Sequence, residues 1–224
     1  PLVSIIIPNK DEPQTLRRCV ESLQKTGYLN YELIIVENNS TLEETFAYYG
    51  ELCGEPYRSG SMQLSCSGTL PGGQKIQVVT WEGNFNYSAI NNFGITYSKG
   101  QYLVLLNNDI EILTPDWLEQ LLGNCQRKDV GIVGTRLYYP DNTYQHAGIV
   151  VGIDGIAANM YPGMRREREG YLHKAALQLN YSAVTAAFLM IRRDVFEKIG
   201  GFEEQLAVAF NDVDLCLRAG AAGY

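Results

Sequence analysis

Three side chains with amide or carboxylate groups, Asn107, Asn108 and Asp109, follow directly on an apolar run at residues 102–106. The run shows no polar alternation, which is typical of a strand buried on both faces of a parallel sheet. In open α/β sheets, ligands bind just beyond the carboxyl ends of the strands. Oxygen donors gathered there suit a hard divalent cation such as Mg²⁺ or Mn²⁺. The alternative is a polar turn in which Asp109 serves only the backbone.

An earlier stretch of the chain ends in the same way. The apolar run at residues 31–36 predicts a strand, and Glu37 stands at its carboxyl end. Ser40 or Thr41 can cap the helix that follows, so simple helix-terminus chemistry is the alternative explanation for Glu37. A second strand that ends in polar groups strengthens the functional interpretation.

The elements that must position these groups alternate between strand and helix. Strands are expected at residues 2–7, 31–36, 75–80 and 102–106, with helical periodicity between them. This order predicts an α/β protein with a mainly parallel, doubly wound sheet and helices on both faces. The glycine- and serine-rich residues 50–73 are expected to form a surface loop. Neither a dinucleotide-binding glycine motif nor a P-loop follows the first strand, so no glycine cradle for phosphates is expected there.

The alternation of strand and helix stops at residue 136, and a different pattern follows. We expect a hairpin around residues 137–143, continued by residues 148–153, and then a loop at residues 159–172. A strand at residues 180–192 and a short helix at 193–199 follow. The last helix begins near Asn211 and carries Asp212 and Asp214 in its first turn, where capping is the alternative to catalysis.

Composition narrows the class of protein. The 224 residues carry a net charge of −7 and no basic stripe, which argues against a nucleic-acid partner. No apolar run reaches membrane-spanning length and no signal peptide is visible. The five cysteines show no C-x-x-C spacing, which indicates reduced thiols and a cytoplasmic location, with a Cys53–Cys66 bridge as the alternative. Because residue 1 is Pro, we expect an excised domain of a longer protein.

Four segments, taken in order, resemble glycosyltransferase family 2. They are VSIIIPNKDE at residues 3–12, YELIIVENNS at 31–40, LLNNDIEI at 105–112, and FLMIRRDVFEKIGGFEE followed by NDVDLCLR between residues 188 and 218. The resemblance implies the nucleotide-diphospho-sugar transferase fold (glycosyltransferase A-type). It also implies a single catalytic domain over residues 1–224, in which residues 1–135 bind the nucleotide sugar and residues 136–224 form the acceptor-side half, cut short at its C-terminal end.

The resemblance also implies roles for individual residues. Asp109 would coordinate the metal with Asn107 beside it, Asp212 would be the catalytic base, and Asp214 would be its structural partner. Glu37 would hydrogen-bond the nucleotide base, and the pair at residues 91 and 92 falls where the family often has an Arg-Asn pair near the ribose and phosphates. The full set of implied nucleotide-binding positions is Pro8, Glu12, Glu37, Asn39, Asn91, Asn92 and Asn108.

This sequence departs from the family pattern at the metal site. The motif reads Asn-Asn-Asp rather than Asp-x-Asp, so one carboxylate has become an amide and a lower metal affinity is expected. An Asn also stands at residue 211, where the family usually has an acid before the base. Many members carry a metal-binding His on a strand after the last helix, whereas this chain ends at Tyr224, and His146 and His173 do not match that position. Weak metal binding, or none, is therefore expected.

The predicted activity is an inverting transfer of a sugar from a nucleotide diphosphate donor to an acceptor hydroxyl, assisted by Mn²⁺ or Mg²⁺. The acceptor would be a glycan or a lipid-linked saccharide in surface polysaccharide synthesis, at the inner face of the membrane if lipid-linked. Acceptor choice should lie in residues 138–174, because loops on a fixed scaffold carry specificity. The alternatives are a sugar-phosphate nucleotidyltransferase, which would want a glycine-rich loop after the first strand, and a non-catalytic nucleotide-sugar-binding domain.

Overall fold

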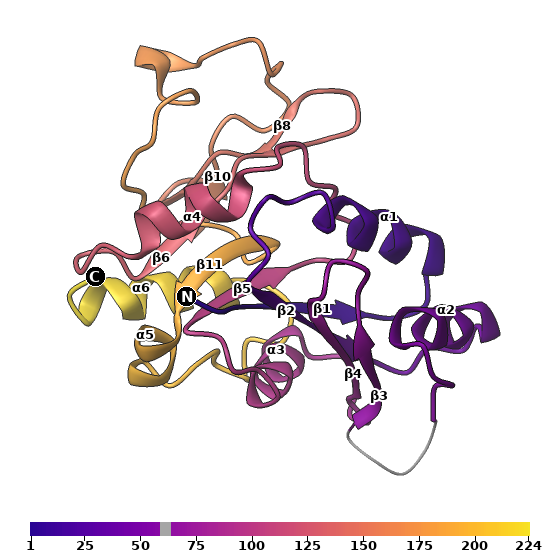
Figure 1. Ribbon diagram of the computed structural model, residues 1–224. Helices are drawn as coiled ribbons and strands as arrows, with labels where there is room; N and C mark the ends of the chain where they lie inside the picture. Colours follow the sequence, from indigo (N-terminus) through magenta and orange to yellow (C-terminus); the bar gives the residue numbers. More distant parts are fainter. Residues whose placement is uncertain (59–63) are drawn as a thin grey trace.

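The computed structural model describes residues 1–58 and 64–224, and a seven-stranded sheet lies at its centre (Figure 1). The strand order is β3-β4-β2-β1-β5-β11-β6. Strands β4, β2, β1 and β5 run parallel, while β3 and β11 are antiparallel to their neighbours. The predicted fold class, a mainly parallel α/β sheet with a mixed second half, is confirmed. The strands are β1 (Val3–Asn9), β2 (Tyr31–Glu37), β3 (Leu64–Thr69), β4 (Lys75–Thr80), β5 (Tyr102–Leu106), β6 (Ile132–Gly134) and β11 (Phe188–Arg192).

Helices cover both faces of this sheet (Figure 1). One face packs against α1 (Pro13–Leu23), α2 (Glu43–Cys53) and α4 (Trp117–Cys125), and the other against α3 (Tyr87–Thr96), α5 (Arg193–Lys198) and α6 (Asn211–Ala221). In β1, Ile5 belongs to the first core cluster and Ile6 to the second, and both are fully buried. Burial on both faces explains why the strands read as continuous apolar runs without alternation.

The part of the chain from residue 136 onward contains two small antiparallel strand pairs. The predicted hairpin is confirmed as β7 (Leu137–Tyr138) paired with β8 (Tyr144–His146). The expectation that residues 148–153 continue this hairpin is wrong, because β9 (Ile149–Val151) pairs instead with β10 (Ala157–Asn159). Gly148 has a φ of 109°, a conformation that favours glycine, and it turns the chain between β8 and β9. A short 3₁₀ turn, η1 (Tyr171–His173), lies in the long segment that follows.

Two other expectations needed correction. The predicted loop at residues 50–73 contains the end of α2 and the edge strand β3, while residues 59–63 of it lie outside the described residues. The predicted strand at residues 180–192 is a strand only at β11. Its first part is irregular because the N–H groups of Thr185 and Ala186 donate to side chains rather than to a neighbouring strand.

The cysteines are free thiols, as expected, and all five are buried. The Cys53 and Cys66 sulfur atoms lie 2.7 Å apart, where the end of α2 meets β3, and they are not bonded. In the described part of the chain, no helix has both the length and the apolar character needed to cross a membrane.

Candidate active site

Polar groups from three parallel strands meet at one edge of the sheet, as the sequence predicted. Asn9 ends β1 and stands opposite Glu37, which ends β2. The Asn108 Nδ2 group, just past β5, donates to Asn9 Oδ1 at 2.7 Å. Asn9 Nδ2 in turn donates to the Tyr49 hydroxyl at 2.7 Å. The carboxyl edge of the sheet is therefore tied together by side-chain amides.

Glu37 holds the loop at this edge together. Its carboxylate is 2% exposed and accepts hydrogen bonds from the Ser40 N–H at 2.5 Å, the Ser40 hydroxyl at 2.6 Å and the Tyr49 hydroxyl at 2.6 Å. Three donors on two buried oxygens leave little room for a ligand. The direct hydrogen bond from Glu37 to a nucleotide base, implied by the family resemblance, is not available in this conformation.

Three other implied nucleotide-binding residues lie at or near the surface of this edge. Glu12 and Asn39 are exposed and Pro8 is half-buried. Asn39 Nδ2 donates to the Gly83 carbonyl at 2.9 Å, which leaves its oxygen without a partner among the described residues. These groups remain open to a ligand.

Asp11, rather than Ser40 or Thr41, accepts hydrogen bonds from the chain just before α2. Its Oδ1 atom accepts the N–H groups of Thr41 at 2.8 Å and Leu42 at 2.9 Å. Burial works against the Asp11 charge, but the hydrogen bonds from Leu42 and Thr41 outweigh it and lower the pKa of the carboxyl. The expected capping by a hydroxyl is thus replaced by a carboxylate from a different loop.

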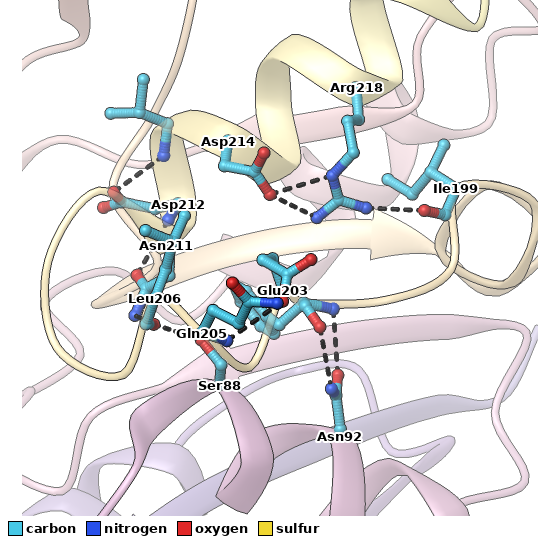
Figure 2. A network of polar contacts seen from close by, with 12 residues as sticks. Ser88, Asn92, Ile199, Glu203, Gln205, Leu206, Asn211, Asp212, Asp214 and Arg218 are labelled. Atoms are coloured by element: carbon cyan, nitrogen blue, oxygen red, sulfur yellow. Dashed lines mark hydrogen bonds and ion pairs between the residues drawn. The ribbon is translucent and has the colours of Figure 1, made fainter.

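The structure uses Asn91 and Asn92 inside the protein, which corrects their implied place beside the ribose and phosphates. Asn91 is 0% exposed, with its Nδ2 bonded to the Tyr87 carbonyl at 2.8 Å and its oxygen without a partner among the described residues. Asn92 donates to the Phe202 carbonyl and accepts the Phe202 N–H, each at 3.0 Å (Figure 2). It also donates to Glu204 at 3.0 Å. Its amide therefore forms hydrogen bonds with the chain before α6 and is not free to contact a ligand.

The candidate metal ligands Asn107 and Asp109 follow β5 on the same edge. Asp109 is exposed and Asn107 is half-buried, and neither side chain has a hydrogen-bond partner among the described residues. No group of three or more His, Cys, Asp or Glu side chains in residues 1–58 and 64–224 could hold a metal by itself. One carboxylate and one amide fit a Mg²⁺-type ion that keeps waters and shares the phosphates of a substrate.

Asp212 lies in the first turn of α6 and is half-buried. Its Oδ1 atom accepts the Val213 N–H at 2.8 Å (Figure 2). Its Oδ2 atom accepts the Ala186 N–H at 3.2 Å. The second bond reaches across to a different segment, so Asp212 does more than cap its own helix. The positive end of the α6 dipole stabilises its negative charge.

The segment at residues 185–187 links Asp212 to the end of β5. Ala187 accepts the Asn107 N–H at 2.9 Å, and the next residue back, Ala186, donates to Asp212. The Tyr87 hydroxyl donates to the Ala186 carbonyl at 2.7 Å and holds the same segment from α3. Tertiary structure therefore brings the candidate base and the candidate metal ligands to one region of the molecule.

A cavity of about 190 Å³ opens beside Asp212. Its lining is both polar and apolar: Ile149, Ala157, Ala158, Asn159, Thr185, Phe210, Asp212 and Val213. A larger hollow of about 480 Å³ lies along α2, between Phe46, Gly50 and Tyr57, and neither Asp212 nor a strand end lines it. We therefore take the smaller cavity as the candidate catalytic one.

Side chains of α3 and α6 form hydrogen bonds with the chain before α6 (Figure 2). The Ser88 hydroxyl donates to the Leu206 carbonyl at 2.7 Å, and Asn211 Nδ2 donates to the same oxygen at 3.3 Å. Arg218 pairs with Asp214 at 2.6 Å and donates to the Ile199 carbonyl at 2.6 Å. Asp214 thus takes part in structural contacts, while Asp212 faces the cavity.

Sequence reasoning missed three groups around this site. Tyr49 completes the Glu37 network, and Asn159 and Thr185 line the cavity. None of them stands in a local pattern of its own, because each is brought to the site by a contact between segments far apart in the chain.

Comparison with known proteins places this arrangement in context. A family model described as Glycosyl transferase family 2 matches residues 4–200. An uncharacterized protein, y4gI, of Sinorhizobium fredii is 44% identical over 229 residues, and the O-antigen biosynthesis protein RfbC of Myxococcus xanthus is 40% identical over 228 residues. Both matches cover 100% of this chain, but the chain spans only 23% and 16% of these relatives.

Solved structures with the same architecture are more distant in sequence. The mannosyltransferase PcManGT from Pyrobaculum calidifontis, in complex with GDP-Man and Mn²⁺, superposes with a TM-score of 0.69 at 14% identity, covering 99% of this chain and 52% of that one. TarS residues 1–349 of S. aureus gives 0.61 at 12% identity, covering 98% of this chain and 55% of that one. At these identities the likeness shows the fold.

Proposed function

The chain belongs to glycosyl transferase family 2, and we propose that it moves a sugar from a nucleotide diphosphate donor to an acceptor hydroxyl with inversion at the sugar carbon. The placement of Asp212 supports this most strongly. Its carboxylate lines a cavity and accepts the Ala186 N–H at 3.2 Å. The next residue, Ala187, accepts the N–H of Asn107. A single displacement requires a base for the acceptor hydroxyl and, nearby, groups that stabilise the negative charge of the leaving diphosphate.

In this mechanism Asp212 receives the proton of the acceptor hydroxyl. The acceptor oxygen forms a bond to the anomeric carbon while the bond from that carbon to the diphosphate oxygen breaks. The Ala186 and Val213 N–H groups fix the carboxylate, so little reorganisation is needed when the proton moves. General-base assistance of this kind is worth about 10²–10⁴-fold in rate.

The donor would lie along the carboxyl edge of β1, β2 and β5. We assign contacts with it to Pro8, Glu12, Asn39 and Asn108, while Glu37 shapes the loop from within. Asp109 and Asn107 would hold Mn²⁺ or Mg²⁺. When bound, this ion stabilises the negative charge that develops on the leaving diphosphate. The solved mannosyltransferase in complex with GDP-Man and Mn²⁺ makes a nucleotide-sugar donor and a divalent ion reasonable.

The acceptor would be a glycan or lipid-linked saccharide in polysaccharide synthesis, in line with the name of the O-antigen biosynthesis protein RfbC. Residues 1–135 would serve the donor and residues 136–224 the acceptor. A lipid-linked acceptor would place the reaction at the cytoplasmic face of a membrane.

Nucleotide binding and transfer test this proposal in two steps. A ligand that binds only the folded state raises the melting temperature, so UDP, GDP and dTDP are compared with and without Mn²⁺. One nucleotide should raise it, more so with Mn²⁺. Transfer from the matching nucleotide sugar is then followed in wild type, Asp212→Asn and Asp214→Asn. The Asp214 variant is the matched control, because it removes a carboxylate from the same helical turn without touching the cavity.

We expect Asp212→Asn to reduce transfer about 10²–10⁴-fold with the nucleotide shift unchanged. Normal transfer by this variant would refute the role of Asp212. Nucleotide binding without any product would favour the alternative, a non-catalytic binding domain. The Asn-Asn-Asp motif supports that alternative, because it has only one carboxylate.

A further inference from the structure

His146 is a buried histidine that the mechanism above does not use. It is 1% exposed and ends β8. Its Nδ1 atom lies 2.6 Å from Asn159 Oδ1. Its Nε2 atom accepts the N–H groups of Gly148 at 3.3 Å and Thr185 at 3.4 Å. Both ring nitrogens are therefore engaged with parts of the acceptor-side half.

These contacts determine the proton position on the ring. Backbone N–H groups can only donate, so Nε2 carries no proton and the ring is neutral with its proton on Nδ1. Burial lowers the His146 pKa, and the opposing effects of Asn159 and Asp212 do not restore it. The Nδ1–H group can only donate, so Asn159 must present its oxygen to His146 and turn its Nδ2 group away.

The Asn159 Nδ2 group is consequently left to face a ligand. Asn159 is exposed and lines the same cavity as Asp212. Nothing in the described part of the chain accepts a hydrogen bond from its Nδ2 atom. We propose that Asn159 donates a hydrogen bond to a second hydroxyl of the acceptor saccharide beside Asp212, and that His146 is the positioning residue that fixes this amide. The proposal rests on the proposed function, because it names the saccharide contact of the same site.

The same imidazole also accepts a hydrogen bond from a second residue of the cavity lining, Thr185. Thr185, whose N–H donates to His146, directly precedes Ala186, whose N–H donates to Asp212. The His146 ring thus connects Asn159 to the segment at residues 185–186, which donates a hydrogen bond to Asp212. A change at His146 should affect saccharide binding more than donor binding, because the donor edge lies on β1, β2 and β5.

Nuclear magnetic resonance of the ring nitrogens tests the hydrogen-bond assignment without turnover. The chain has only two histidines, so a His173→Gln variant assigns both signals. We expect His146 to be the neutral Nδ1–H tautomer from about pH 7 to pH 8. A proton on Nε2, or a charged ring in this range, would overturn the assignment of the Asn159 amide.

Saccharide binding tests the ligand. Octyl glucoside, octyl galactoside and octyl mannoside are titrated into the chain while the side-chain amide signal of Asn159 is followed. We expect that signal to move with at least one glycoside. Asn159→Asp, which keeps the acceptor for His146 but lacks the N–H donor, should bind that glycoside about 10-fold more weakly. Asn180→Asp is the matched control, because it makes the same change on an exposed residue outside the cavity lining.

Variants of His146 separate positioning from mere packing. His146→Ala should weaken glycoside binding, whereas His146→Asn, which can keep a donor toward Asn159, should recover part of it with the donor nucleotide shift unchanged. Equal binding by both variants, or no movement of the Asn159 amide with any glycoside, would overturn the proposal. A wild-type chain that binds a glycoside through Asn159 but transfers no sugar would refute the proposed transferase and leave this site intact.

Discussion

Replacing Tyr49 by Phe removes one hydroxyl from the centre of the network at the carboxyl edge of the sheet. That hydroxyl donates to the buried Glu37 carboxylate at 2.6 Å and accepts from Asn9 Nδ2 at 2.7 Å. A hydrogen bond to a charged group contributes about 1.5–3 kcal/mol. Asn9 Nδ2 keeps a bond to the Asp11 carbonyl at 3.1 Å, so little is added for its lost partner. We expect Tyr49→Phe to lower the free energy of unfolding by about 2–3 kcal/mol.

Thermal unfolding without ligand measures this change. For a domain of this size, 1 kcal/mol corresponds to about 2–4 °C in melting temperature, so a fall of about 4–12 °C is expected. Tyr57→Phe is the matched control, because the Tyr57 hydroxyl is within 3.0 Å of the neutral Thr80 hydroxyl and the residue is half-buried. Its cost should be about 1 kcal/mol or less.

The comparison also distinguishes the two roles discussed for Glu37. If Glu37 shapes the loop, Tyr49→Phe destabilises the protein whether or not a nucleotide is present. If instead Glu37 binds the nucleotide base, the ligand-free protein should lose no more stability than Tyr57→Phe, and only the nucleotide-induced shift should shrink. That second outcome would refute our reading of the network.

Three further predictions use other parts of the structure. Gly68→Ala should lower the free energy of unfolding by about 1–3 kcal/mol, because its Cβ would lie 2.2 Å from the Cys53 carbonyl oxygen. Gly123→Ala in α4, where the added Cβ would meet no atom within 4 Å, should raise it by about 0.5–1 kcal/mol; equal effects in denaturant unfolding would contradict this packing. Asp11→Asn should lower the melting temperature more at pH 6 than at pH 3. Folding lowers the pKa of this carboxyl, so it stabilises the protein fully above its unfolded pKa of about 3.9 and progressively less as pH falls toward its folded pKa; a difference independent of pH would count against a role of its charge. Asp212→Asn should reduce transfer about 10²–10⁴-fold in a product assay while the nucleotide-induced thermal shift persists, and a parallel loss of both would indicate a structural role.

Local patterns along the chain predicted much of the fold. Buried apolar runs indicated β1, β2, β4 and β5, because strands covered on both faces need no polar alternation. The polar residues at the ends of these runs predicted a common edge, since parallel strands bring their carboxyl ends together. Edge strand β3 was missed because its small and polar residues resemble those of a loop.

Only the tertiary structure decided which polar side chains could meet a ligand. The family resemblance implied that Asn91 and Asn92 lie near the ribose and phosphates, yet packing of α3 against the chain before α6 buries one and occupies the other. The oxygens of Glu37 are taken by Ser40 and Tyr49 for the same reason. Buried polar groups must find partners inside the protein, and those partners are set by packing rather than by neighbours in sequence.

The contacts of Asp212 and His146 show this difference most clearly. The sequence determined that Asp212 opens a helix and that His146 follows a hairpin turn. The tertiary structure determined that His146 contacts Thr185 across 39 residues and that Ala186 contacts Asp212 across 26. The spacing of apolar residues along the chain determines helices and strands. A site built from loops depends instead on backbone N–H groups that are not paired within the sheet, and these groups donate to side chains far away in the sequence.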